Sequence, residues 1–305
     1  MKYHITHITD YVYQSPSSLC HNMMVQTPRD LDFQQVEHFE QIIEPAPQHL
    51  HKSKDFFDNE RVYFSIEKTH SKLTITSKSI VTIETPSWMN VDPGQTQSWE
   101  EVQQWLQTTE AMNDIRQFYL QSKHVDFPNG IQEYTIESFT PGRPIMEAML
   151  ELNHRIHEDF TFTPGFTDIS TPISEVFANK KGVCQDYAHF TIACLRSIGL
   201  AARYVSGYLE TLPPPGKPKM VGADASHAWI ALYIPGLDWV EFDATNDLLV
   251  DDQHVRVAFG RDFADVTPLK GIIFSSGNQV MKVSVDVRRP EELADLDNSK
   301  LAIKP

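Results

Sequence analysis

The chain has 305 residues and a formal net charge of −15, with 41 acidic against 26 basic side chains. Proteins that bind nucleic acids contact phosphates through clusters of Lys and Arg, and the sequence contains no such basic run, which argues against a nucleic-acid partner. Its apolar stretches are short, so we expect no membrane-spanning segment. Three cysteines form an odd and sparse set, and the N-terminus lacks the apolar centre of a secretion signal. These features predict a cytoplasmic protein.

Residues 1–86 are rich in strand signals and poor in helix signals. Val62, Phe64 and Ile66 alternate with polar residues, and a similar alternation runs through residues 73–83. Because successive side chains of a strand point to opposite faces, this pattern is typical of half-buried strands. We expect residues 1–86 to form an N-terminal antiparallel β-sandwich-like domain.

The pattern changes after Pro86. Residues 87–142 are expected to form a helical connecting segment, in which Ser98 and Glu101 have the spacing of a capping box. Residues 143–305 begin with a helical pattern that Pro144 opens. In their second half, apolar and polar residues again alternate with a period of two, as in strands. This last segment is expected to be a core that carries the C-terminal strands, so the predicted fold class is α+β.

Cys184 is the first candidate for chemistry. A helical pattern begins at Cys184, after the turn-forming Gly182, and ends at Gly199. The free N–H groups and the dipole at a helix N-terminus stabilise a thiolate, the reactive form of cysteine. A single free cysteine is more often a small buried hydrophobe, so position alone does not decide the matter. Cys194 lies about 15 Å further along the same helix and is expected to belong to the core.

Residues 225–245 predict a hairpin around Pro235-Gly236. On the first strand His227 shares a face with Trp229, and on the second strand Asp243 shares a face with Glu241. The apolar residues of both strands must face one core, which constrains the register because a slip of one residue inverts every side chain. His227 and Asp243 therefore lie on one common face, within reach of a histidine–carboxylate hydrogen bond. A base and the group that orients it are the partners that a cysteine nucleophile needs.

Several segments together resemble the core of the transglutaminase-like superfamily. They are GVCQDYAHF, ARYVSGY, SHAW and WVEFDAT, in this order. The N-terminal residues Pro28-Arg29-Asp30, Gln35 and Asp58-Asn59 resemble the N-terminal region of bacterial transglutaminase-like proteins, and residues 260–271 resemble their C-terminal part. The resemblance covers nearly the whole chain, with residues 87–142 the least specific part.

The resemblance implies a papain-like fold and a catalytic triad. Carried over to this sequence, Cys184 is the nucleophile, His227 the general acid–base and Asp243 the orienting carboxylate. Ala244 departs from the pattern, because many relatives have Pro directly after the aspartate. No cofactor or metal is implied, and the expected partner is a protein or peptide substrate.

The remaining polar candidates have simpler explanations. Asp186 suits the start of a helix, and His189 should face away from Cys184 because it lies about 140° around the helix. Trp229 and Trp239 are candidates for the walls of a substrate groove, although burial in the core is the commoner role of such residues. His154 and His157, followed by Glu158, have the spacing of zinc ligands but no third ligand, so we expect no zinc site.

Three functions remain compatible with these features. Resolution of a thioester by water would make the protein a cysteine peptidase or amidase, which we favour because no Ca²⁺-binding loop is evident. Resolution by a lysine-type amine would make it a transglutaminase, for which Glu241 could attract the amine. A non-catalytic domain that binds proteins is the third alternative, and the presence of all three triad residues argues against it.

Overall fold

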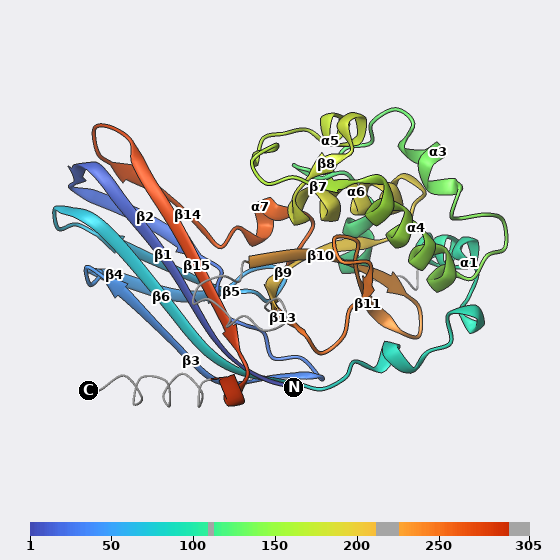
Figure 1. The fold of residues 1–305 in the computed structure, drawn as a ribbon, viewed down its shortest axis with the longest axis horizontal. Coiled ribbons are helices and arrows are strands. Elements are labelled where there is room, and N and C mark those ends of the chain that lie inside the picture. The colour runs from blue at the N-terminus through green and yellow to red at the C-terminus, as the bar shows by residue number, and fades with distance from the viewer. Residues whose placement is uncertain (109–112, 212–225, 293–305) are drawn as a thin grey trace, which may run out of the picture.

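The computed structural model describes residues 1–108, 113–211 and 226–292. Strands from both ends of the chain form one side of the molecule, and a five-stranded sheet covered by helices forms the other (Figure 1). The structure is thus a mixed α/β fold with antiparallel sheets. No helix within the described ranges is long and apolar enough to cross a bilayer.

Two four-stranded antiparallel sheets make up the first side. Their strand orders are β15-β1-β6-β3 and β14-β2-β5-β4. In β1 every second side chain from Tyr3 to Thr9 is buried, as the alternating pattern predicts. The strands are β1 (Lys2–Ser17), β2 (Leu19–Met24), β3 (Gln34–Glu44), β4 (His49–Lys54), β5 (Glu60–Ile66), β6 (His70–Ile83), β14 (Leu269–Phe274) and β15 (Gln279–Arg288).

The two sheets contribute to one apolar cluster. Tyr13, Leu73 and Ile75 of the first sheet pack with Phe64 and Ile66 of the second, and all five are at most 5% exposed. Burial of this apolar surface is the main force that stabilises the N-terminal part.

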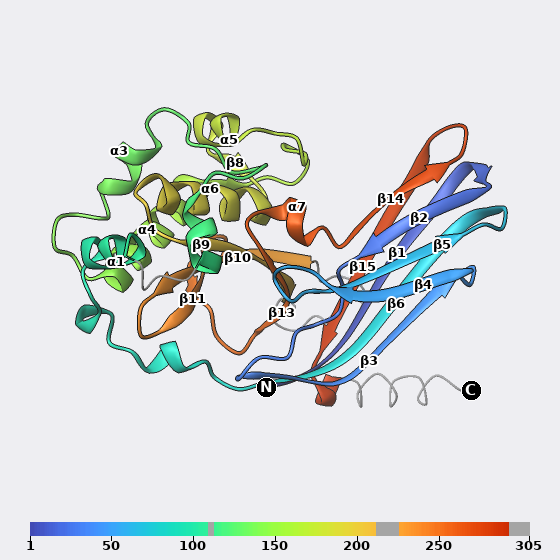
Figure 2. The same cartoon turned by 180° about the vertical axis from the view of Figure 1, so that it is seen from behind.

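The C-terminal strands differ from their expected place. They were expected to belong to the core formed by residues 143–305, whereas β15 pairs with β1 and β14 pairs with β2. The chain therefore completes its N-terminal sheets with its last strands, which are coloured red beside blue in both views (Figures 1 and 2). A local pattern identifies a strand but not its partner more than 200 residues away, which explains the difference.

Helices connect the two sides and cover the second. The predicted capping box is confirmed, because Glu101 accepts the backbone N–H of Ser98 at 2.9 Å and the Ser98 hydroxyl accepts that of Glu101. The α-helices are α1 (Trp99–Leu106), α2 (Asn113–Arg116), α3 (Ile131–Ile136), α4 (Ile145–Asp159), α5 (Ile173–Asn179), α6 (Cys184–Ser197) and α7 (Phe263–Val266). Short 3-10 helices are η1 (Ser87–Asn90), η2 (Pro93–Gln95) and η3 (Gln117–Tyr119).

The five-stranded sheet has the order β12-β11-β10-β9-β13. On β10, Ala228, Ile230 and Leu232 share an apolar cluster with Val240 and Phe242 of β11, which confirms the predicted common core face. The strands are β9 (Ala202–Leu209), β10 (Ser226–Ile234), β11 (Asp238–Asp243), β12 (Leu248–Leu249) and β13 (His254–Gly260), with the short parallel pair β7 (Thr161–Phe162) and β8 (Lys181–Gly182) apart from them.

Hydrogen bonds join the N-terminal part to β13. The side chain of Gln34 accepts the N–H of Arg256 and donates to its carbonyl, both at 2.8 Å. The side chain of Asn59 makes the same pair of bonds with Phe259, at 2.9 and 2.7 Å. Because each amide occupies both backbone groups of one residue, it replaces the hydrogen bonds that a neighbouring strand would make at that point of β13.

Candidate active site

Cys184 is the first residue of α6. Asp186 fixes the entry to the helix, because its carboxylate accepts the N–H of Val183 at 2.7 Å and the hydroxyl of Thr167 at 2.6 Å. A side chain at Gly182 would lie 2.6 Å from Asp186, so only glycine allows this approach. The Cys184 side chain is partly buried. The thiol therefore stands at the positive end of a helix whose start is fixed.

Amide groups at this helix start are free to bind an anion. Within the described ranges, the backbone N–H groups of Cys184 and Gln185 donate to no acceptor, whereas those of Asp186 and Tyr187 donate to the carbonyl of Val183. Two adjacent free N–H groups beside a nucleophile are the kind of donors that stabilise a developing oxyanion.

His227 and Asp243 lie on neighbouring antiparallel strands. The register pairs Ala231 of β10 with Glu241 of β11, so His227 and Asp243 are diagonal partners on one face. The Nε2 atom of His227 is 2.7 Å from an Asp243 carboxylate oxygen. The geometry therefore agrees with the side-chain faces that the alternating pattern predicts.

The charge on His227 is stabilised from two sides. Burial is the largest single influence and lowers the pKa of His227, but the charge and hydrogen bond of Asp243, followed by a hydrogen bond with Cys184, raise it from 6.5 to about 10. Because Nε2 is bound to Asp243, Nδ1 is the nitrogen that is available to the Cys184 sulfur. The imidazole is thus placed between a thiol and a carboxylate, where it can exchange a proton with the thiol.

The carboxylate of Asp243 is completely buried and accepts several hydrogen bonds. Besides His227, its donors are the side chain of Asn246 at 2.7 Å, the N–H of Thr245 at 3.0 Å and Nε2 of His254 at 3.1 Å. Burial raises the pKa of Asp243, but the interactions with His227 and His254 outweigh it and hold the pKa well below the usual value. The group is therefore ionised and held in one orientation.

His254 is a residue that the sequence analysis missed. It lies on β13, is fully buried, and packs edge-on against Trp229 with ring centroids 5.0 Å apart. It reaches Asp243 because β13 and β11 belong to one sheet, although β10 and β9 separate them. Its position eleven residues beyond Asp243 carries no local signal, but a polar residue at the start of a mostly apolar strand could have drawn attention.

Helix α4 holds the turn that follows Asp243. Asn153 donates to the backbone carbonyl of Asp243 at 3.3 Å, His154 contacts the carboxylate of Asp247 at 2.7 Å, and Nδ1 of His157 lies 3.0 Å from the carbonyl of Thr245. The two histidines that have zinc-ligand spacing in the sequence thus bind separate acceptors in this turn.

Glu241 has a structural role in this arrangement. It is 1% exposed, and one carboxylate oxygen accepts Nε1–H of Trp229 at 2.7 Å and Nε–H of Arg256 at 2.9 Å. The ion pair with Arg256 neutralises the carboxylate, so Glu241 is not placed to attract a substrate amine. Glu241 thereby links Arg256 on β13 to Trp229, whose ring packs against the rings of His227 and His254.

Other sequence candidates have defined places. His189 is 5% exposed, and its Nε2 accepts the N–H of Phe263 at 3.1 Å. Burial lowers the pKa of His189 to about 3, which keeps the ring neutral and able to accept that bond. Trp229 is 1% exposed and therefore belongs to the core, whereas Trp239 is partly exposed and lines a separate cavity.

The polar groups around Asp243 also have the composition of a metal site. One ligand atom each of His227, Asp243 and His254 lies within 4.8 Å of the others. Both histidine nitrogens contact the same carboxylate oxygen, however, so the proximity is explained by hydrogen bonds that share one acceptor.

The two environments of Cys184 and Cys194 predict selective alkylation. Cys194 is 0% exposed, and its burial raises the pKa of its thiol to about 12. Cys184 stands beside an imidazole that keeps its proton up to about pH 10 and so stabilises a thiolate. Iodoacetamide at pH ~6.5 should therefore modify Cys184 well before Cys194, as peptide mapping would measure. Faster modification of Cys194 would contradict an activated thiol at the helix start.

Comparisons with known proteins cover nearly the whole chain. The model of the bacterial transglutaminase-like N-terminal region matches residues 3–82, and that of the transglutaminase-like superfamily matches residues 134–244. An uncharacterized protein of Mycobacterium tuberculosis is 41% identical over 294 residues, which are 94% of this chain and 92% of the relative. An uncharacterized protein of Mycobacterium leprae is 30% identical over 292 residues, which are 93% and 98% of the two chains.

A solved structure shares the fold. The crystal structure of a candidate cysteine protease from Cytophaga hutchinsonii superposes with a TM-score of 0.74 at 21% sequence identity. The superposition covers 94% of this chain and 90% of the other, so it includes the N-terminal sheets as well as the helix-covered sheet.

Proposed function

Because the chain belongs to the transglutaminase-like superfamily, we propose that it is a cysteine-dependent acyl-transfer enzyme that hydrolyses amide or peptide bonds. The observation that carries the proposal is the position of His227, between the thiol of Cys184 and the buried carboxylate of Asp243. A protein or peptide is the substrate class that this chemistry fits.

The proposed first half-reaction is acylation of Cys184. With the proton of the Cys184–His227 pair held on Nδ1 of His227, the sulfur attacks the carbonyl carbon of the amide as a thiolate. The carbonyl oxygen becomes an oxyanion, which the free N–H groups of Cys184 and Gln185 can bind. His227 then donates its proton to the leaving nitrogen, the C–N bond breaks, and a thioester remains on Cys184.

Deacylation reverses these roles. His227, now neutral, accepts a proton from water, whose oxygen attacks the thioester carbonyl and releases the free acid and the thiol. Asp243 holds the imidazole in the required orientation and stabilises the imidazolium in both halves.

The hydrogen bonds that Glu241 makes within the protein favour hydrolysis over amine transfer. Water at ~55 M competes with any amine, so a transferase must bind its amine or exclude water from the thioester. Glu241 is the acidic residue that shares the predicted strand face with Asp243, and Arg256 and Trp229 already bind one oxygen of its carboxylate. We therefore propose that water is the usual acceptor.

Product analysis tests this proposal. Wild type and Cys184→Ala would be screened against peptide amides and glutamine-containing peptides, with and without a millimolar lysine analogue, and the products identified by mass spectrometry. We expect free acid as the main product of the wild type, unchanged by the amine, and none from Cys184→Ala. A dominant amine conjugate would instead identify a transglutaminase, and binding without turnover of any substrate would indicate a non-catalytic domain.

A further inference from the structure

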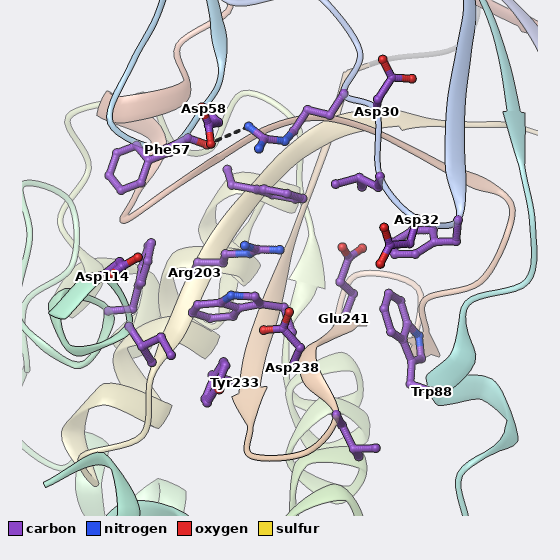
Figure 3. Close-up of a pocket in the computed structure, with 18 of the residues that line it drawn as sticks. Asp30, Asp32, Phe57, Asp58, Trp88, Asp114, Arg203, Tyr233, Asp238 and Glu241 are labelled. Atoms are coloured by element: carbon purple, nitrogen blue, oxygen red, sulfur yellow. Dashed lines mark hydrogen bonds between the residues drawn. The ribbon is translucent and has the colours of Figure 1, made fainter. Parts of the chain in front are cut away.

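A cavity of about 710 Å³ lies apart from the candidate active site. Its walls come from the loops around Arg29 and Phe57 of the N-terminal part and from the outer face of the five-stranded sheet (Figure 3). Its lining includes none of Cys184, His227 and Asp243. On β9, Arg203 in this cavity is four residues from Gly207, the partner of His227, which corresponds to about 13 Å along the strand.

The guanidinium group of Arg203 forms the floor of this cavity. It is held between two aromatic rings, 4.4 Å from the centroid of Trp239 and 3.6 Å from that of Phe259. Its Nε is enclosed without a hydrogen-bond acceptor, and Arg203 makes no ion pair or hydrogen bond with any other residue in the described ranges. Burial lowers the pKa of Arg203, opposed by the nearby carboxylate of Glu241, yet the group stays charged at neutral pH.

Two buried arginines of this protein have hydrogen-bond or ion-pair partners, in contrast to Arg203, which is partly exposed. Arg196, 2% exposed, donates to the carbonyls of Leu120, Ala202 and Arg261, and Arg256, 0% exposed, pairs with Glu241. An enclosed cation is costly unless it is paired or hydrogen-bonded. The guanidinium group of Arg203 is thus a cation held in place by its surroundings, with N–H groups available to the cavity. A planar guanidinium binds a carboxylate through two parallel hydrogen bonds.

The mouth of the cavity has the opposite charge. Asp30, Asp32, Asp58, Asp114 and Asp238 line it and are all exposed. These carboxylates would repel a phosphate dianion but would attract the ammonium group of a ligand whose carboxylate pairs with Arg203. Between floor and mouth the walls are aromatic, with Phe118, Tyr233 and Trp239 among them.

From this arrangement we infer that the cavity binds a zwitterionic ligand, either a free amino acid with an apolar side chain or a short peptide with free termini. The carboxylate of the ligand pairs with Arg203, its side chain packs on the aromatic walls, and its ammonium group faces the aspartates. A volume of about 710 Å³ is within the range of small-molecule sites. The inference does not depend on the proposed function, because the site contains no residue of the proposed triad.

Calorimetric titration of the full chain tests this inference. The Cys184→Ala variant would be used so that no peptide is consumed, with L-phenylalanine and Gly-Gly-Phe as the two probes. The probe that binds more tightly shows whether the ligand is a free amino acid or a short peptide. L-phenylalaninamide and N-acetyl-L-phenylalanine each lack one charged end and should bind at least about tenfold more weakly than the better probe.

Substitutions then locate the site. Arg203→Met should weaken binding of the better probe at least about tenfold. Arg203→Lys should have a similar effect, because lysine keeps the charge but cannot make two parallel hydrogen bonds to a carboxylate. Asp238→Asn, at the exposed mouth, should weaken binding of the zwitterionic probe but not binding of N-acetyl-L-phenylalanine, which has no ammonium group. The control is Arg261→Met, which removes a surface arginine paired with Asp265 and should leave binding unchanged. Absence of binding of either probe at ~10 mM, or equal affinity in Arg203→Met, Arg203→Lys and the control, would overturn the inference.

Discussion

Replacement of Cys184 by alanine is expected to lower kcat/KM by about 10⁶-fold, to the level at which only binding and oxyanion stabilisation remain. The reason is that the proposed reaction passes through a covalent thioester, for which no other thiol is placed. Cys194 and Cys20 are each 0% exposed, and Cys194 is about 15 Å from Cys184 along the helix. Steady-state kinetics with the best substrate from the product screen measure the effect.

The matched control is Cys194→Ala. It removes a thiol from the same helix and leaves a small cavity in the core, so the melting temperature should fall while kcat/KM stays near the wild-type value. Equal loss of activity in both variants would show that the helix, not the Cys184 thiol, is what matters. Full activity in Cys184→Ala would exclude this residue as the nucleophile.

Replacement of Asp243 by asparagine is expected to lower kcat by about 10⁴-fold. An amide at this position presents an N–H₂ group as well as an oxygen to His227, Asn246 and His254, all of which now donate to one carboxylate. His227 would lose its charge partner, so its pKa should fall from about 10 and the ring would no longer be held charged beside Cys184. The measurement is kcat together with the pH dependence of Cys184 alkylation.

The sign of that pH effect follows from the pKa shift. In the wild type His227 is protonated below about pH 10, so a positive charge stands beside the Cys184 sulfur at neutral pH. In Asp243→Asn the rate of alkylation at pH ~6.5 should drop towards that of an ordinary thiol, whose pKa is about 8.5. Asp10→Asn, which breaks a surface ion pair with Lys72 far from the site, is the control and should change neither quantity. An unchanged alkylation profile in Asp243→Asn would refute the orienting role.

The sequence predicts the hairpin face correctly because the side-chain period of a strand is two. Ala228, Ile230 and Leu232 must be buried with Val240 and Phe242, and this requirement alone places His227 and Asp243 together. The helix start at Cys184 is readable for a similar reason, since glycine, a helical stripe and a closing glycine are all local signals.

What the sequence does not predict depends on contacts between distant segments. His254 reaches Asp243 through the order of strands in the sheet, and that order is not encoded in any single strand. The pairing of the last strands with β1 and β2 is missed for the same reason. Arg203 looks like an ordinary strand residue until the N-terminal loops close a cavity over it.

The most direct test of the central claim is to identify the acylated residue. Wild-type enzyme would be mixed with an excess of its best substrate, quenched in acid within the first turnover, and digested for mass spectrometry. We predict an acyl group on the peptide that contains Cys184, released by hydroxylamine as expected for a thioester, and absent from Cys184→Ala. Turnover with no acyl group on Cys184, or an acyl group on another residue, would contradict the account.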